Sequence, residues 1–412
     1  MKKKNLFYLA ALSLCMAFSM SSCSDDDPKP DVIDTPEDLD YTAENASAWG
    51  NYMYNVALLL DKDATDLYKY WSVDYNSKGS FLTQFKDQTG GTYNSPKACI
   101  EEMVQNGMWN IANEVGTAKI KDPYDKYTGG DKEGGIYAVE SWYSWHSRDD
   151  YTNNIFSIRN TYYGRIDDND VKKVNENLNA FASYKDFDDE GDIHENSFSK
   201  LVASVDSDLD EKIKELIFNA AKAIQSIPQP FRNNIDSEES VAAMNACNEL
   251  ANTLKNELLP FVSNELSDSK YDKQMASVVS QFADAVVMPT YKDLETKNKA
   301  LLAAVQAFKD APSDINFQKG CEAWITAREP WEKSEAFLFG PVGVENLDPN
   351  MDSWPLDQNG IVQVLKDQKW DDMEWSDGAS DEAIEAAQGI RGYHTLEYLL
   401  FKDGKPRTVD TK

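Results

Sequence analysis

The chain has 412 residues, with 71 acidic side chains against 41 lysines and arginines, so its net charge is −30. Its hydrophobic fraction of 41% is that of a globular protein, and its length suffices for a sizeable core and two or three domains. The acidity excludes a nucleic-acid binder, because neutralising phosphates requires a basic surface.

The N-terminal residues are predicted to be a targeting segment. Lys2, Lys3 and Lys4 precede an apolar stretch from Leu6 to Phe18, which is shorter than the roughly 20 residues of a membrane-spanning helix. The tetrapeptide Met20-Ser21-Ser22-Cys23 resembles a bacterial lipobox. We therefore expect a lipoprotein signal peptide over residues 1–22 and lipid attachment at Cys23, with a plain secretory signal as the alternative.

Residues 23–45 are expected to form an acidic tether. The run Ser24-Asp25-Asp26-Asp27 resembles the export signals of surface-displayed lipoproteins, which favours an outer-membrane lipoprotein exposed at the cell surface, or otherwise one that faces the periplasm. Three further cysteines, Cys99, Cys247 and Cys321, are odd in number and lie far apart. We expect no disulfide framework and no cysteine metal site, and each thiol should fill a helix core.

Most of the remaining chain shows the 3.6-residue periodicity of helices. Helices are predicted at 49–60, 100–116, 208–227, 236–258, 272–308 with an interruption at Pro289, 314–338, and from about Asp381 through the last apolar cluster. Strand signals are scarce, so the predicted fold class is all-α, built from two helical-bundle halves.

Long segments rich in Gly, Asp and aromatic residues, at 122–147, 164–192 and 340–380, are predicted to be loops. The polar segment Ser263–Tyr271 joins two long helices and is the preferred domain boundary. It divides the chain into one helical half at 46–268 and a second at 269–412.

The chain has three histidines, His146, His194 and His394. His146 lies among aromatic residues and should pack, whereas His194 lies in an acidic loop and should be solvated. His394 precedes Glu397 by three positions, which puts both side chains on one helix face, within reach of one cation. A buried pair in which the His394 and Glu397 side chains hydrogen-bond to each other, with no cation, would give the same pattern.

A second stretch combines aromatic and charged side chains at helical spacing. Trp324, Arg328, Trp331 and Glu335 follow i, i+4, i+7 and i+11, so they share one face of the predicted helix. Charge on such a face indicates a polar interior or a cleft, because core faces are normally apolar. The alternative is an ion pair between Arg328 and Glu332 on the surface.

Together these segments resemble the imelysin family. The resemblance is carried by the GxHxxE motif at 392–397, by the Trp-x3-Arg-x2-Trp run that ends at Pro341, and by Asp352-Ser353-Trp354-Pro355. The N-terminal half adds the Glu-Val-Gly segment around Glu114, then Glu140, Ser141, Ser144 and Asp150. In imelysins the half with GxHxxE usually comes first, so this chain looks circularly permuted, with Ser263–Tyr271 joining the usual termini.

The resemblance implies a site in the cleft between two helical halves and a role in bacterial iron uptake. The metal would be iron, or zinc, because the ligands expected at the site combine nitrogen and oxygen. The expected ligands are His394, Glu397 and Glu335. The expected cleft residues are Arg328, Trp331, Glu332, Ser334, Gly392, Glu114, Ser144 and Asp150.

Arg328 fits better as a clamp on a carboxylate, from a glutamate or from an anionic chelator, than beside a bare cation. The expected partners are a metal or metal chelate, the membrane through the lipid at Cys23, and an outer-membrane iron-transport protein. Two alternatives remain open. One is a metal-dependent peptidase, which needs about three protein ligands and an open position on the metal. The other is a non-catalytic adaptor for an outer-membrane receptor.

Overall fold

The computed structural model describes residues 39–166, 178–189, 191–376 and 378–409. Over these residues the fold is all-α, as predicted, and its strands β1 (Phe401–Lys402) and β2 (Lys405–Pro406) pair in one short antiparallel ribbon. In this part of the chain no helix is both long and apolar enough to cross a membrane. The predicted signal peptide, Cys23 and residues 23–38 of the tether lie outside the described residues.

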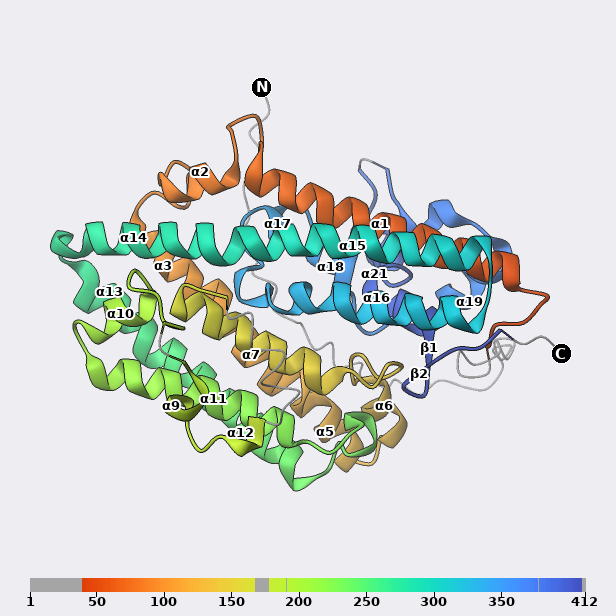
Figure 1. Cartoon of the computed structure of the whole chain (residues 1–412), viewed down its shortest axis with the longest axis horizontal. Helices are drawn as coiled ribbons and strands as arrows, with labels where there is room; N and C mark the ends of the chain where they lie inside the picture. The colour runs from red at the N-terminus through yellow and green to blue at the C-terminus, as the bar shows by residue number, and fades with distance from the viewer. Residues whose placement is uncertain (1–38, 167–177, 190, 377, 410–412) are drawn as a thin grey trace, which may run out of the picture.

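The helices form two layers (Figure 1). In the first layer, α1 packs along α15, and α15 along α16. This layer contains α1 (Ala46–Ser72), α14 (Asp272–Phe282), α15 (Met288–Asp310), α16 (Asp314–Glu332), α17 (Pro341–Val344), α18 (Leu347–Asp352), α19 (Gln358–Asp367), α20 (Asp381–Gln388) and α21 (Gly392–Leu400).

In the second layer, α11 packs against both α7 and α12. The layer contains α4 (Trp109–Glu114), α5 (Lys121–Thr128), α6 (Lys132–Tyr137), α7 (Ser147–Tyr163), α9 (Tyr184–Phe187), α10 (Phe198–Ala203), α11 (Ser207–Ser226), α12 (Glu238–Thr253) and α13 (Leu259–Asn264). Helices α2 (Phe81–Lys86) and α3 (Pro96–Glu102) connect it to α1. The layers meet where α7 packs against α16, and this contact carries the candidate site.

Helix α1 belongs to the first layer although it starts the predicted N-terminal half. The indole nitrogen of Trp49 donates to the carbonyl of Leu399 at 3.0 Å, and the Tyr52 hydroxyl donates to that of Ile390 at 2.7 Å. The two layers therefore do not follow the chain boundary at residue 268, and the domain division stays a prediction. The connection 263–271 itself is largely exposed, as expected of a link between two long helices.

The helical rod of α14 and α15 passes through Pro289 without the predicted interruption (Figure 1). A proline ring normally clashes with the carbonyl four residues earlier and lacks the N–H of that turn. Here residues Ala283–Val287 form a wider π-helical turn just before Pro289. In such a turn the hydrogen bonds run from i to i+5 instead of i to i+4, and the helix continues past the proline.

Short helices occupy much of the two predicted loops at 122–147 and 340–380, namely α5, α6 and α17 to α19. The prediction of long loops is wrong there, because elements of four to ten residues carry too few apolar positions for a periodic pattern. In the third loop, residues 167–177 and 190 lie outside the described part. The three cysteines Cys99, Cys247 and Cys321 are buried and unpaired, as expected of core thiols.

The predicted helix from Asp381 is in fact two helices, because the backbone turns at Gly392. Gly392 has a φ of +86°, and a Cβ atom there would lie 2.6 Å from the carbonyl oxygen of Met351. A glycine is required for both reasons. After this break, α21 packs against α18, which ends at Asp352.

Replacing Gly392 by alanine should destabilise the protein by about 2 to 5 kcal/mol, since left-handed backbone and a backbone clash both oppose the side chain. Urea unfolding measures the loss. Gly79 is the matched control, because its φ is +81° but nothing lies within 4 Å of its added Cβ. An equal loss in Gly79→Ala and Gly392→Ala would show that the contact with Met351 is unimportant.

Candidate functional site

Arg328 on α16 lies at the centre of the site and is fully buried. Its guanidinium pairs with Glu332 at 2.6 Å, with Asp150 at 3.5 Å and with Asp352. Burial opposes the charge, but these three carboxylates raise the pKa of Arg328 well above its ordinary value. The Arg328–Glu332 pair considered for the surface does form, but it lies in the interior.

His394 lies between two carboxylates. Its Nδ1 is 3.0 Å from Glu397, the i+3 partner expected from the sequence, and its Nε2 is 3.1 Å from Asp352. Burial and the charge of Arg328 disfavour protonation, yet the two carboxylates outweigh them and raise the pKa of His394 to about 9. The edge of the Trp354 ring packs against the imidazole, with 4.7 Å between the ring centroids.

Ser144 and Asp150 come from the other layer and complete these contacts. The Ser144 backbone N–H and hydroxyl donate to Glu397 at 2.8 and 2.7 Å. The Ser141 hydroxyl donates to Asp150 at 2.6 Å, which orients the carboxylate that faces Arg328. The structure therefore brings together, across the interface of the layers, most of the residues that the sequence singled out.

Asp352 connects the Arg328 pairs to His394. Besides these two partners, it accepts a hydrogen bond of 2.6 Å from the indole nitrogen of Trp331. Burial works against its charge, but Arg328 and His394 hold the pKa of Asp352 far below its ordinary value. Asp352 was not among the predicted site residues, although it opens the Asp-Ser-Trp-Pro segment that carried part of the resemblance.

Glu332, Glu335 and Asp352 form a cluster of carboxylates whose oxygens lie within 4.8 Å of one another. We call this set the carboxylate triad. Burial raises the pKa of Glu332 to about 8, despite Arg328, and it raises the pKa of Glu335 well above its ordinary value. Glu332 accepts a hydrogen bond from the Asn154 amide on α7. Among the described residues, none donates a hydrogen bond to Glu335, although only 8% of that residue is exposed.

Lys119 lies beside the triad, at the end of the π-helical turn Val115–Lys119. Its ammonium is 2.7 Å from Glu140 and 3.4 Å from Glu114, and its side chain is 4% exposed. Burial opposes this charge, but the surrounding glutamates raise the pKa of Lys119 well above its ordinary value. This contact places Glu114 at the outer edge of the cluster.

The other candidates have structural roles. The Ser334 hydroxyl donates to the carbonyl of Trp331 at 2.7 Å, and a role for Ser334 as a ligand or cleft residue stays a prediction. His146 packs edge-on against Trp324 with its Nε2 4.0 Å from Asp150, whereas Nδ1 of His194 accepts the backbone N–H of Asn196. Gly392 positions α21 through its backbone, as described above.

Sequence reasoning missed Asp348 and Asn154 as well as Asp352. Burial and the neighbouring Asp352 raise the pKa of Asp348 to about 7, which marks it as part of the same acidic group. The α7 positions Asp150, Asn154 and Ser157 share one helix face, and the Ser157 hydroxyl accepts the backbone N–H of Ala336. This polar spacing along α7 was a signal that could have located the interface.

The arrangement fits a hard cation. Carboxylate oxygens from three elements converge, and within the described residues the buried Oε1 of Glu332 has no hydrogen-bond donor. A metal bound by Glu332, Glu335 and Asp352 would keep His394 as the partner that orients Asp352. To act as a direct ligand, the imidazole would have to lose a proton and give up one of its two carboxylate contacts.

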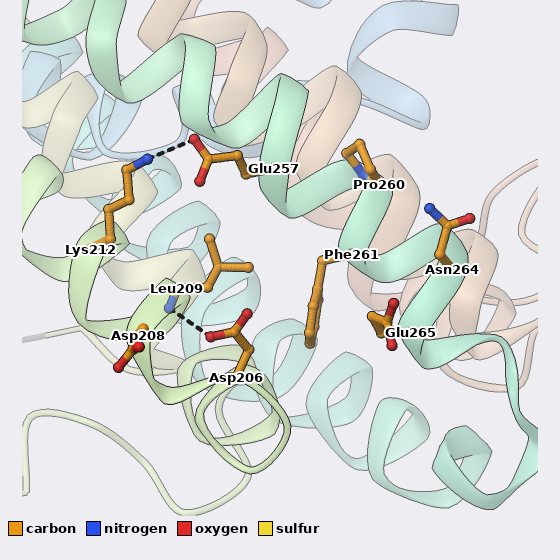
Figure 2. Close-up of a pocket in the computed structure, with 9 residues that line it drawn as sticks. All are labelled: Asp206, Asp208, Leu209, Lys212, Glu257, Pro260, Phe261, Asn264 and Glu265. Carbon is orange, nitrogen blue, oxygen red and sulfur yellow. Dashed lines mark hydrogen bonds and ion pairs between the residues drawn. The ribbon is translucent and has the colours of Figure 1, made fainter.

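A hollow of about 520 Å³ lies elsewhere on the surface, between α11 and α13 (Figure 2). Two of its charged groups have partners, since Lys212 pairs with Glu257 at 2.6 Å and Asp206 caps α11 through the N–H of Leu209. We therefore place the candidate site at the interface of the layers.

Comparisons with known proteins show which family the chain resembles in sequence and fold. Residues 25–256 and 287–412 match the family described as Imelysin. A solved structure of an imelysin peptidase from Bacteroides ovatus is 54% identical and superposes with a TM-score of 0.83, covering 91% of this chain and all of that one. Iron-regulated protein A of Synechococcus elongatus is 32% identical over 133 residues, which is 32% of this chain and 33% of that protein. The chain thus spans about a third of that relative's length.

Proposed function

Because the chain belongs to the imelysin family, we propose that it binds iron or an iron-bearing ligand at the carboxylate triad and serves bacterial iron uptake as a lipoprotein. The iron-regulated relative supports the choice of metal. Oxygen ligands of this kind also suit a ferric or ferrous ion better than a soft metal.

The Glu335 carboxyl carries the proposal. Burial raises the pKa of this carboxyl well above its ordinary value, and the neighbouring Glu332 adds to the effect, although the charge of Lys119 opposes both. A bound metal ion would compensate all three at once. His394 and Glu397, the ligands expected from the sequence, connect to the same group through Asp352 and remain proposed ligands.

Calorimetric titration of the metal-free protein with Fe²⁺ under anaerobic conditions, and with Fe³⁺ citrate, tests the proposal. We expect saturable binding of at least one of these, and the absence of both would contradict it. His394→Ala alone would not decide the question. That imidazole is 1% exposed between two carboxylates, so its loss lowers stability whether or not it binds metal.

Anchoring at Cys23 is a separate proposal, supported by the lipobox-like sequence. Replacing Cys23 by serine should abolish labelling by a radioactive fatty acid and release a folded, soluble protein from the membrane fraction. Cys15→Ser is the control, since that cysteine lies within the proposed signal peptide. Unchanged membrane retention of Cys23→Ser would contradict lipid attachment at that residue.

A metal-dependent peptidase is the second candidate, and the description of the Bacteroides ovatus structure favours it. Here Glu332, His394 and Glu397 are almost fully buried, so a peptide carbonyl would reach a metal at this place only after the layers moved apart. Cleavage of a peptide library that stops on chelation would establish this activity. Binding to an outer-membrane receptor without metal would instead establish the adaptor.

Circular permutation remains part of the proposal, supported by two features of the described residues. The segment 263–271 is a largely exposed connection, apart from the buried Leu266. The two ends of the described chain also lie side by side, because Arg407 donates to Asp40 at 2.7 Å and Lys402 pairs with the same carboxylate at 2.7 Å. Adjacent ends are the requirement for such a rearrangement.

A further inference from the structure

The loop 138–146, which connects α6 to α7, covers one side of the candidate site. Ser144 in this loop is partly exposed, yet its backbone N–H and hydroxyl donate to the buried Glu397 at 2.8 and 2.7 Å. The contacts continue inward, because Glu397 lies 3.0 Å from His394, whose Nε2 lies 3.1 Å from Asp352 of the triad. On this side, a single partly exposed residue therefore separates Glu397 from solvent.

The same loop is docked on the other layer at the turn between β1 and β2. The backbone N–H of Gly404 in this turn donates to the carbonyl of Tyr143 at 2.9 Å. A Cβ atom at Gly404 would overlap the ring of Trp145, so the indole lies directly against the backbone of the turn. The loop and β2 lie at one end of the molecule, and the two chain crossings between the layers, near α3 and α13, lie at the opposite end (Figure 1). Non-covalent contacts thus fasten the loop.

The docked loop has an unfavourable conformation of its own. Ser141 and Trp145 have φ values of +52° and +62°, the left-handed region that residues with a side chain rarely adopt. The indole nitrogen of Trp145 is buried, and none of the described residues makes a hydrogen bond to it. Strain of this kind persists where surrounding contacts impose it, and it is concentrated at ligand clamps and switch regions. The contacts with Glu397 and the turn therefore hold the loop in a conformation that opposes them.

From these observations we propose that the loop 138–146 is a lid, which leaves Glu397 to admit the ligand and then closes over it. The inference rests on the proposed function for the ligand, whereas the movement itself is a property of the metal-free protein. An ion or a small chelate needs only this loop to move, not a whole layer. Local strain favours opening without global unfolding. Ser144 is a positioning residue, because in the closed lid it holds Glu397 and through it His394.

Hydrogen exchange of the metal-free protein, resolved to single residues by mass spectrometry, tests the movement. The amides of Ser144 and Gly404 should exchange about 100-fold or more faster than amides in the middle of α15, which packs between α1 and α16. Trp145→Ala should raise both rates a further tenfold or so and leave α15 unchanged, since it removes the packing against the turn. Trp109→Ala is the matched control. That indole is also partly buried, but it lies on α4 under the Lys255 ammonium, and its loss should change neither rate.

Exchange of both amides as slow as that of α15, or rates that stay unchanged in Trp145→Ala, would overturn the lid. Ser144→Ala removes one hydroxyl and keeps the test valid if Trp145→Ala fails to fold. It too should raise the exchange of the Gly404 amide, which the Ser144 side chain affects only through the docked loop.

A second measurement connects the lid to the ligand. Saturating Fe²⁺ under anaerobic conditions should slow the exchange of both amides about tenfold, because a bound ion favours the closed form. Unchanged exchange in a protein that binds Fe²⁺ would overturn the lid's role in ligand binding and leave the metal site intact. A protein that binds no Fe²⁺ would contradict the metal site, and exchange in the metal-free protein would still decide whether the loop opens.

Discussion

Replacing Arg328 by methionine should destabilise the protein by about 3 to 5 kcal/mol, the loss typical when one partner of a buried ion pair is removed. Glu332, Asp352 and Asp150 would each lose their contact with the same guanidinium. Methionine has a similar length, so the change removes the charge and leaves most of the volume filled. Urea unfolding followed by circular dichroism measures the difference.

A double variant separates charge from packing. If uncompensated carboxylates cause the loss, Arg328→Met combined with Glu332→Gln should recover part of the stability. Arg165 is the control, because it is exposed and donates to the carbonyl of Gly191, and Arg165→Met should change stability by about 0.5 kcal/mol at most. Equal stability of Arg328→Met and the unmodified protein would contradict the role of this ion-pair cluster.

Replacing Glu335 by glutamine should have opposite effects on stability and on metal binding. Burial already disfavours the charged form of Glu335, so a neutral side chain of the same shape should leave the metal-free protein equally or more stable. The affinity for Fe²⁺ should fall about 100-fold or more, since outer partners of metal ligands alone contribute 10- to 100-fold. Thermal unfolding and competition with a chromophoric chelator measure the two effects.

Glu385 provides the control for that experiment, because it is an exposed glutamate on α20 outside the cluster. Glu385→Gln should alter neither stability nor affinity. An unchanged affinity in Glu335→Gln would show that the metal does not bind at the triad. A large loss of stability in the metal-free variant would show that Glu335 has a structural partner.

The long helices were predictable because their sequences carry a sustained apolar period. Periodicity at Trp49, Met53, Val56 and Leu60 predicts the buried face of α1, and all four are buried. The π-helical turns, such as Ala283–Val287, were not predictable from apolar periodicity. Their residues keep the apolar spacing of an α-helix, and it is tertiary packing that determines whether a proline such as Pro289 ends a helix or follows a π turn.

The site was predictable within one helix and not between helices. The spacing of His394 and Glu397 places them on one face of α21, and they do contact each other. Asp352 and Ser144 approach this pair from other elements, and no local pattern fixes that approach. The polar segment that contains Asp352 was visible, but the sequence could not show that α18 ends beside α21.

The contacts of Ser144 with Glu397 and of Asp150 with Arg328 bear on how the protein reaches its native state. Each contact joins a group before residue 268 to a group after it, and most of the atoms involved are shielded from water. Separated at the 263–271 connection, each fragment would expose part of the interface and leave charged groups without their counterparts. Neither fragment is thus expected to be an autonomous folding unit, and the native site forms only when both assemble. Fragment complementation is the behaviour that this interface implies.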